Sequence, residues 1–335
     1  MISKLIEAIY TKVFVNIIVN RSSTNVYIEV CSRNNVDQSD EKEFESISMN
    51  EKMHDFIYSY TQDTPYFYIS ILDTSQSQGA IPTCEKSQMS KFYDADTSTY
   101  ICNSNNWAHY SSKYDLELLK NSYKDVGIDF IFSSFSVLSS FFKDKIDSTM
   151  AMYILVEDNY ISLSVFDNSK LLFAKHLDME YEDESSLLID EEEEDEEDFD
   201  LGESVNLDDL DVDDDMDSLD DLGDIEDLGN IEEMTDFEEE GEISDISSEE
   251  DDTSSLETEG FNEDYQRYSL IQNAINTFYK DPKYESKFIE TVYIADSIGV
   301  SSDLKTYLEE DMFLSVYIRQ LDLSSEICEL AKEEV

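Results

Sequence analysis

The sequence predicts an α/β protein with two folded units and one long acidic insertion. Short runs alternate apolar with polar residues, as in Ile161–Phe166, which is the pattern of strands with one buried face. Between such runs lie segments whose apolar residues follow helical spacing. A third stretch is almost wholly acidic. Because strands and helices alternate on both sides of that stretch, an α/β fold is expected.

The first unit, placed at residues 1–148, opens with a predicted hairpin. Val13–Val19 and Val26–Val30 are apolar runs, and the segment between them is rich in Asn and Ser, which favour turns. Asn50 is predicted to cap a helix, since Asn accepts hydrogen bonds from the free N–H groups of a first turn. The other predicted elements are strands at 66–72 and 128–132 and helices at 114–124 and 135–142.

The second unit is predicted from two separate pieces, residues 149–178 and 261–335. The first piece has the pattern of three antiparallel strands with turns at Asp158 and Asn168. The second piece predicts a helix capped by Asn262, a strand at 288–295, a helix from Ser301 or Ser302, a strand at 315–318 and a helix capped by Ser324 or Ser325. A three-stranded meander alone buries too little apolar surface to be stable. We therefore expect the two pieces to share one sheet.

Residues 179–260 form the acidic stretch, which we predict to be disordered. Between Glu180 and Gly260 the chain has 41 acidic residues and no Lys or Arg, within a net charge of −58 for the whole chain. Mutual repulsion and a shortage of apolar surface oppose the collapse of such a segment. The rest of the chain carries 39 acidic and 22 basic residues together with enough large apolar residues to form a core.

Composition also excludes several classes of function. The acidic balance argues against nucleic-acid binding, which depends on Lys and Arg. The chain has no apolar run of 18 residues, so we expect no transmembrane segment, and its start lacks the features of a secretory signal. Because no phosphate-binding loop, catalytic motif or metal-ligand spacing is found, no catalytic residue, cofactor or metal is expected. The four scattered cysteines predict reduced thiols and a cytoplasmic protein; they are Cys31, Cys84, Cys102 and Cys328.

A row of apolar residues within the acidic stretch is the candidate partner-binding site. These residues recur about every three positions among acidic neighbours. One interpretation is a solvating spacer, and the other is an acidic amphipathic helix that folds against a basic, apolar groove of a partner. We favour the second, because a spacer has no need of helically spaced Leu and Ile. The residues are Leu207, Leu210, Leu219, Leu222, Ile225, Leu228 and Ile231.

Two segments of the second unit resemble the actin-like proteins of type IV pilus and type II secretion machines, namely the PilM family and the cytoplasmic domain of GspL. The segment YISLSVFDNSKLLFAKHL is similar to the hairpin that opens their second domain. The segment IETVYIADSIGVSSDLKTYLEEDMFLSVYI is similar to the late βαβ part of that domain. The resemblance implies an actin-like (ribonuclease H-like) fold of two domains.

The same resemblance indicates where a nucleotide would bind. Members of the family that bind ATP hold phosphate with Asp-x-Gly turns in two hairpins and hold the nucleoside with a Gly-Gly pair. Glycine is used because the backbone must approach the phosphates closely. Arg21, Glu157 and Ser297 stand at positions where the family has small or glycine residues. The resemblance therefore implies a degenerate nucleotide site.

The function expected from these observations is that of a non-enzymatic cytoplasmic scaffold. PilM-type proteins hold the cytoplasmic tail of a membrane partner. By resemblance, this chain would dock on an inner-membrane assembly-platform protein of a type IV pilus, type II secretion or DNA-uptake machine, as a peripheral protein. Two alternatives stay open. One is a divergent actin-like ATPase, and the other is an acidic adaptor or chaperone that contacts a basic protein through its acidic tract.

Overall fold

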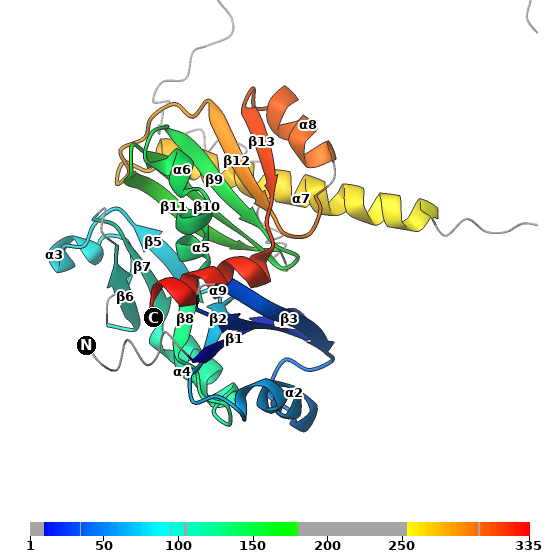
Figure 1. Cartoon of the computed structure of the whole chain (residues 1–335). Helices are drawn as coiled ribbons and strands as arrows, with labels where there is room; N and C mark the ends of the chain where they lie inside the picture. Colours follow the sequence, from blue (N-terminus) through cyan, green and yellow to red (C-terminus); the bar gives the residue numbers. More distant parts are fainter. Residues whose placement is uncertain (1–9, 34, 95, 104–105, 180–252, 301) are drawn as a thin grey trace, which may run out of the picture. The chain divides into compact units, whose positions relative to one another are not determined.

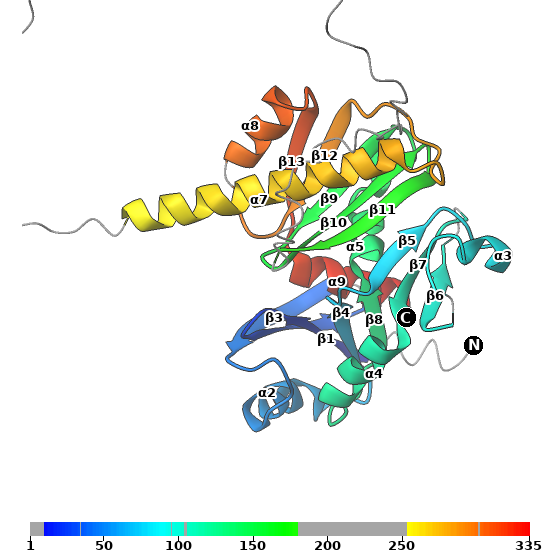
Figure 2. The ribbon, with the colours of Figure 1, turned by 180° about the vertical axis from the view of Figure 1, so that it is seen from behind.

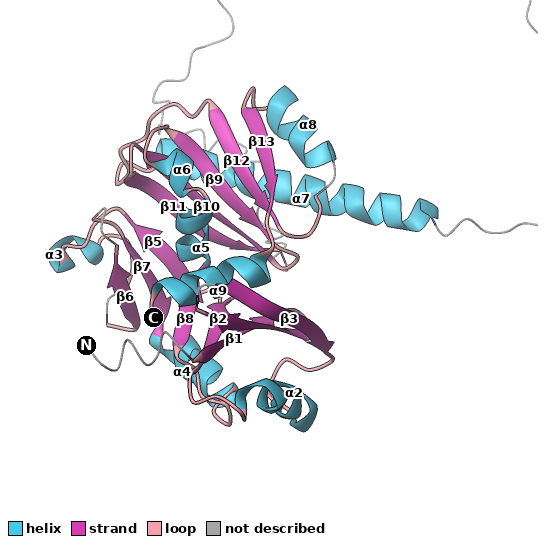
Figure 3. Ribbon diagram, viewed as in Figure 1, coloured by secondary structure: helices cyan, strands magenta, loops and turns pink. Residues whose placement is uncertain are grey.

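In a computed structural model, the chain forms two five-stranded sheets and one three-stranded sheet (Figures 1 and 3). The structure describes residues 10–33, 35–94, 96–103, 106–179, 253–300 and 302–335. All of these belong to one unit that spans residues 1–182 and 252–335. The domain boundary predicted at residue 148 stays a prediction. The seven apolar residues of the candidate partner site, and the disorder predicted for the acidic stretch around them, lie outside the described residues.

The first sheet combines an antiparallel meander with two parallel strands. Its order is β3 (Asn35–Phe44), β2 (Thr24–Ser32), β1 (Thr11–Val19), β4 (Phe67–Asp73) and β8 (Phe130–Ser133). The central strand β1 is buried from Val13 to Ile18, because apolar residues cover both of its faces: Val15 shares a core with Ile57, and Phe14 shares one with Cys328. Helix α2 (Glu51–Thr61) follows β3, and the Asn50 side chain accepts a hydrogen bond of 2.9 Å from the Met53 N–H. The predicted cap is therefore confirmed.

Strand β3 is missing from the expectations drawn from the sequence. Its residues, NVDQSDEKEF, are almost all polar, and most of them are exposed. It lies at the edge of the sheet, where charged side chains protect the unpaired backbone from pairing with other chains. Because the strand buries little, its sequence has no apolar alternation to indicate it.

The second sheet repeats the order of the first. It runs β11 (Lys170–Asp178), β10 (Tyr160–Asp167), β9 (Ala151–Val156), β12 (Thr291–Asp296) and β13 (Ser315–Gln320). Strands β9 to β11 pair antiparallel, as the predicted meander requires. Strand β12 pairs in parallel with β9, so the pieces on both sides of the acidic stretch share one sheet, as predicted. A meander followed by two parallel strands thus occurs twice, which is the actin-like arrangement.

One long helix covers a face of the second sheet. Helix α7 (Thr253–Lys280) lies across strands β9 to β11 in Figure 2, and α8 (Ser302–Glu310) packs beside it. Ile271 and Phe278 of α7 share a core with Leu163 and Phe173 of the sheet. The helix begins at Thr253, so Asn262 lies inside it and is not its cap. The prediction failed because Asn is favoured at a helix start but is also tolerated within a helix.

The last helix, α9 (Leu323–Glu333), contacts both five-stranded sheets (Figure 1). Ile327 shares a core with Tyr153 of β9, and Cys328 packs with Phe14 of β1. The helix is capped by Asp322, whose carboxylate accepts a hydrogen bond of 3.0 Å from the Ser325 N–H. The predicted cap at Ser324 or Ser325 is therefore wrong by two or three residues.

A small third sheet is inserted between β4 and β8, and the sequence did not predict it. Its order is β5 (Gln78–Ile81), β7 (Ala108–Ser112) and β6 (Ser98–Cys102), with the short helix α3 (Lys86–Met89) between β5 and β6. The helices that complete the first half are α4 (Lys113–Ser122), α5 (Ser134–Phe141) and α6 (Lys143–Ile146). Strands of four or five residues are too short to show a clear period of two.

Candidate functional site

Three turns meet where an actin-like protein would hold a nucleotide, and the first is the turn between β1 and β2. The Asn20 N–H donates to the Ser23 carbonyl at 2.9 Å, which closes the turn. The Arg21 side chain extends from it and donates through Nη2 to the Asp158 carbonyl, 3.2 Å away, in the turn between β9 and β10. The two hairpin turns are therefore tied to each other by the residue that replaces glycine.

The second turn places a carboxyl group beneath the protein surface. Glu157 follows β9 and is only 9% exposed. The Ser297 hydroxyl contacts the Oε1 atom of Glu157. It also lies 2.9 Å from the Val156 carbonyl oxygen, to which it donates a hydrogen bond. The pKa of Glu157 is raised to about 7, mainly by burial; the contact with Ser297 opposes the shift, and the nearby carboxylates of Asp158 and Asp296 add to it.

The third turn follows β12 and uses its own backbone donors internally. The buried Asp296 carboxylate accepts hydrogen bonds from the N–H groups of Ile298, Gly299 and Val300, at 3.2, 2.8 and 3.1 Å. Its second oxygen accepts from Gln320 Nε2 at 2.6 Å. Gly299 has a φ of +83°, a conformation that glycine adopts without strain. These N–H groups are the kind that would bind an anionic ligand, but here a protein carboxylate occupies them.

Together the three turns present carboxylates and occupied N–H groups in the region that the sequence resemblance assigns to a phosphate chain. A polyphosphate would meet the charges of Asp158, Asp296 and ionised Glu157, which repel it. It would also have to displace the bond between Arg21 and the Asp158 carbonyl. Within the described residues, no group of three or more His, Cys, Asp or Glu side chains is placed to hold a metal ion. The arrangement is suited to holding two hairpins together.

A second candidate site lies between β6 and β8 and is called the β6–β8 groove. It is defined by Tyr100, Ile101, His109, Asp129 and Ile131, which line a cavity of about 260 Å³. Four of them, all but Tyr100, also line an adjoining cavity of about 640 Å³ that extends to α5 and α9. Ile101 is 59% exposed, so the groove offers apolar surface to a ligand.

Both walls of the groove are edge strands. In the described sheets, β6 pairs only with β7, and β8 pairs only with β4. The outer edge of each strand therefore carries backbone N–H and C=O groups without a strand partner. An extended peptide can add to such an edge through main-chain hydrogen bonds and place its side chains in the neighbouring cavities. The geometry of the groove suits this mode of binding.

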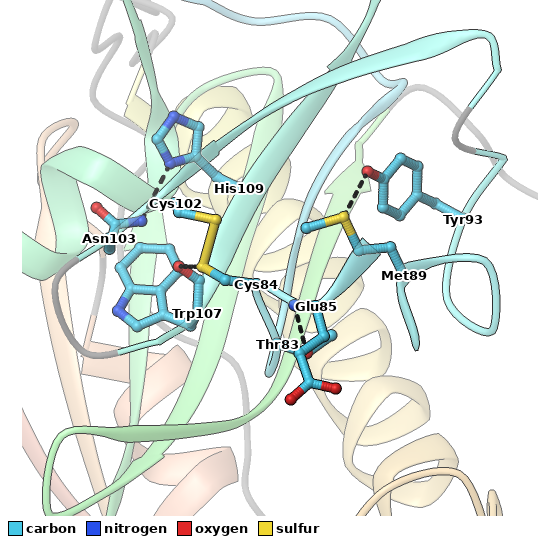
Figure 4. Close-up of a disulfide and its surroundings, with 9 residues drawn as sticks. All are labelled: Thr83, Cys84, Glu85, Met89, Tyr93, Cys102, Asn103, Trp107 and His109. Carbon is cyan, nitrogen blue, oxygen red and sulfur yellow. Dashed lines mark hydrogen bonds between the residues drawn. A yellow bond between two sulfur atoms is a disulfide. The ribbon is translucent and has the colours of Figure 1, made fainter. Parts of the chain in front are cut away.

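A disulfide closes the end of the three-stranded sheet (Figure 4). Cys84 lies after β5 and Cys102 ends β6, and their Cα atoms are 5.7 Å apart. The prediction that all four cysteines are reduced thiols is therefore wrong for this pair, whereas Cys31 and Cys328 are free and buried. Two cysteines 18 residues apart gave no sign of pairing, because only the sheet brings them together.

His109 stands beside this disulfide in the floor of the groove (Figure 4). Its Nδ1 atom lies 3.4 Å from the Asn103 side-chain amide. Burial lowers the pKa of His109 to about 4, so the ring is neutral at physiological pH. The sequence did not predict the groove. The apolar pair Tyr100–Ile101, which the structure shows to be exposed, was the feature of the sequence that could have indicated it.

The duplicated sheet and the joined hairpins define an actin-like protein of two ribonuclease H-like halves. The chain belongs to the family described as domain of unknown function DUF8341, which matches residues 152–335. A second family, domain of unknown function DUF8569, matches residues 10–139. None of the curated proteins matches the chain. Among the described helices, none has both the length and the apolar character needed to cross a lipid bilayer.

Several solved structures are similar to the chain at low sequence identity. A Bacteroides thetaiotaomicron protein with an actin-like ATPase fold and unknown function is 11% identical, with a TM-score of 0.48 over 97% of this chain and 96% of that one. The PilM–PilN type IV pilus biogenesis complex gives 8% identity and a TM-score of 0.46, over 94% of each chain. Component A of (R)-2-hydroxyglutaryl-CoA dehydratase from Acidaminococcus fermentans is 8% identical in sequence, with a TM-score of 0.36 over 95% of each chain.

Proposed function

We propose that this protein is a non-enzymatic scaffold of the PilM and GspL type that binds an extended segment of a partner in the β6–β8 groove. The partner would be an inner-membrane assembly-platform protein of a type IV pilus, type II secretion or DNA-uptake machine. The scaffold would act in the cytoplasm, at the inner membrane as a peripheral protein. The choice of machine rests on the sequence resemblance of residues 160–177 and 289–318.

The observation that carries the proposal is the state of the nucleotide position. Arg21 joins the two hairpin turns, Glu157 is buried between them, and Asp296 uses the backbone donors of the third turn. An ATPase needs these positions free for phosphate and for a cation. The groove, by contrast, has open strand edges and exposed apolar side chains. These features favour partner binding over nucleotide turnover.

Nucleotide binding is tested by thermal unfolding of the full chain with ATP and Mg²⁺. A ligand at a hundred times its dissociation constant stabilises a folded protein by about 2.7 kcal/mol, which raises the melting temperature by several degrees. We expect no shift up to millimolar ATP. A rise in melting temperature of several degrees with ATP, which is larger still in the Arg21→Gly variant, would identify a working nucleotide site. That result would contradict the proposal.

Partner binding is tested with Ile101→Asp, which puts a charge into the groove at an exposed position that the core does not need. The ligands are synthetic peptides of the cytoplasmic segments of platform proteins encoded beside this gene, and binding is measured by calorimetry. We expect one peptide to bind wild type and to bind Ile101→Asp at least tenfold more weakly. The control is Ile47→Asp, which changes a similarly exposed side chain outside the groove. Equal binding of the peptide by all three proteins would exclude the groove as the binding site.

A further inference from the structure

Two phenylalanines are exposed together at one end of the second sheet. Phe313 is 86% exposed and Phe288 is 74% exposed. Phe288 precedes β12 and Phe313 precedes β13, and these parallel strands pair in register from Thr291 and Ser315. The Ser315 N–H donates to the Glu290 carbonyl at 2.8 Å, so the two preceding segments run side by side. The two exposed side chains therefore lie on adjacent segments at the same end of the sheet, and we call this region the Phe288–Phe313 surface.

Phe313 adopts a backbone conformation that its side chain disfavours. Its φ is +56°, in the left-handed region where a bulky residue is rare. The turn itself is needed, because it returns the chain from α8 to β13 and lets the buried Leu314 donate its N–H to the Leu308 carbonyl at 3.1 Å. Gly or Asn would make the same turn without strain. Phe313 buries little of its side chain in the fold, and strain of this kind is typical of binding sites.

The rim of the surface is acidic. Glu290, Glu310 and Asp311 flank the two phenylalanines and are exposed. Of the nearby lysines, Lys287 pairs with Asp167 at 2.5 Å and Lys305 lies 3.7 Å from Glu309. A partner that carries positive charge matches this acidic rim, whereas an acidic partner would be repelled by it.

The mode of contact is through side chains and not through strand addition. β13 is the edge strand of its sheet, but the Val316 N–H on that strand already donates to Glu309 Oε1 at 3.4 Å. A second copy of the chain is an unfavourable partner, because the net charge of −58 makes two copies repel each other. The rings remain available, and they suit the apolar face of an amphipathic helix.

We propose that the Phe288–Phe313 surface docks a basic amphipathic segment of a different protein. It lies at the opposite end of β12 from Asp296, so it is separate from the nucleotide position and from the β6–β8 groove. The two phenylalanines supply the apolar contact, and Glu290, Glu310 and Asp311 pair with Lys or Arg of the segment. The scaffold would thereby hold a second partner, independently of the first.

The test uses the full chain and a synthetic peptide that forms a helix with leucines on one face and lysines beside them. Binding is located by hydrogen exchange, which separates this surface from nonspecific attraction to the acidic stretch. We expect the peptide to slow hydrogen exchange at residues 286–291 and 311–317, relative to the protein without peptide, in wild type and in the control Ile47→Asn. The protection should disappear in the double variant Phe288→Ser, Phe313→Asn. Asn tolerates the left-handed conformation, so this variant should fold with a melting temperature equal to or above that of wild type if Phe313 is strained.

Four results would contradict the proposal. The first is equal protection of these segments in wild type and in the double variant, or none in either. The second is self-association in sedimentation that the double variant abolishes, which would make a second copy the occupant. The third is binding to vesicles of phosphatidylethanolamine and phosphatidylglycerol that the double variant loses, which would assign the surface to a membrane. A matched peptide with glutamates in place of lysines should give no protection, and protection by it would also contradict the proposed chemistry.

Discussion

At the scale of single residues, the site is decided by which polar groups are buried and what they contact. Glu157 and Asp296 lie within one small region, yet their surroundings differ. Asp296 accepts hydrogen bonds from three backbone N–H groups and from Gln320. Glu157 has the Ser297 hydroxyl as its side-chain partner, so desolvation dominates and raises its pKa to about 7. Two carboxyl groups in neighbouring turns therefore differ in the hydrogen bonds that they receive.

Glu157→Gln should stabilise the protein at high pH and leave it unchanged at low pH. The folded-state pKa of about 7 lies above the ordinary value of 4.5, so the folded protein keeps a proton that the unfolded chain has lost. The free energy of unfolding of wild type therefore falls as the pH rises through that window, whereas glutamine carries no charge to desolvate. We expect the variant to gain up to about 3 kcal/mol over wild type at pH 8 and almost nothing at pH 4.5. Urea unfolding at both pH values measures this difference.

The matched control for this experiment is Glu290→Gln, since Glu290 is exposed. Its difference from wild type should stay within a few tenths of a kcal/mol at every pH. A gain by Glu157→Gln that is independent of pH would show that packing, and not desolvation of the charge, is responsible.

At the scale of elements, α9 and the third sheet depend on local details that fix their ends. Helix α9 is held by its cap, by its core residues Ile327 and Cys328, and by the Asn16 amide, which donates to the Ser324 carbonyl at 3.3 Å. The third sheet has three short strands and relies on the Cys84–Cys102 disulfide. Small elements of this kind gain a large part of their stability from a few specific contacts.

Asp322→Ala should cost about 1 kcal/mol of stability, whereas Ser325→Ala should cost little. The Asp322 carboxylate satisfies the Ser325 N–H at the start of α9, and alanine would leave that donor unpaired. The Ser325 side chain has no such role in the cap. Chemical denaturation of both variants measures the difference. If Ser325→Ala cost more than Asp322→Ala, the position of the cap would be wrong.

Reduction of the disulfide should destabilise the groove wall. Cys84 and Cys102 close a loop with a sequence separation of 18, for which a cross-link contributes about 3 kcal/mol by restricting the unfolded chain. We expect dithiothreitol to speed hydrogen exchange in β5, β6 and β7 of the wild type. The double variant Cys84→Ser, Cys102→Ser should exchange fast with or without the reductant. If the wild type were unaffected by reduction, the bond would not contribute to the stability of this sheet.

At the scale of the whole molecule, residues far apart in the chain form shared cores. Met152 and Leu163 of the meander pack with Tyr268 and Ile294, which follow the acidic stretch. Another core joins Leu72 of the first sheet to Tyr153 of the second and to residues of α9. None of these groups could bury its apolar surface alone. The acidic stretch therefore interrupts a folding unit in sequence but not in its packing.

Cleavage within residues 180–252 should leave the two fragments associated. The fragments contribute β9 to β11 and β12 to β13 to one sheet, and separating them would expose the apolar core between the sheet and α7. Glutamyl endopeptidase, which cuts after Glu, followed by gel filtration without denaturant, tests this. We expect both fragments to elute together and to separate only in urea. Separation in buffer alone would contradict a shared core.

Elements with strong periodicity were predictable, and elements without it were not. The meander near Ile161 and the helix capped by Asn50 were found, because alternation and capping are local properties. Strand β3 and the third sheet were missed, since their residues are polar or their strands are short. Of the candidate sites, the residues at the nucleotide position were named from the sequence. The β6–β8 groove was not, because its walls come from separate strands.

The sequence by itself determined the α/β class, the acidic stretch, and the presence of Arg21, Glu157 and Ser297 at positions where the resembled family has small or glycine residues. Composition, periodicity and residue identity can be determined from the sequence without knowledge of the tertiary contacts. Only the tertiary structure decided that Arg21 ties two hairpins together, that Cys84 meets Cys102, and that the segments of Phe288 and Phe313 lie side by side. Each of these pairs depends on the register of strands distant in the chain, and register is set by the packing of the whole sheet and not by any local pattern.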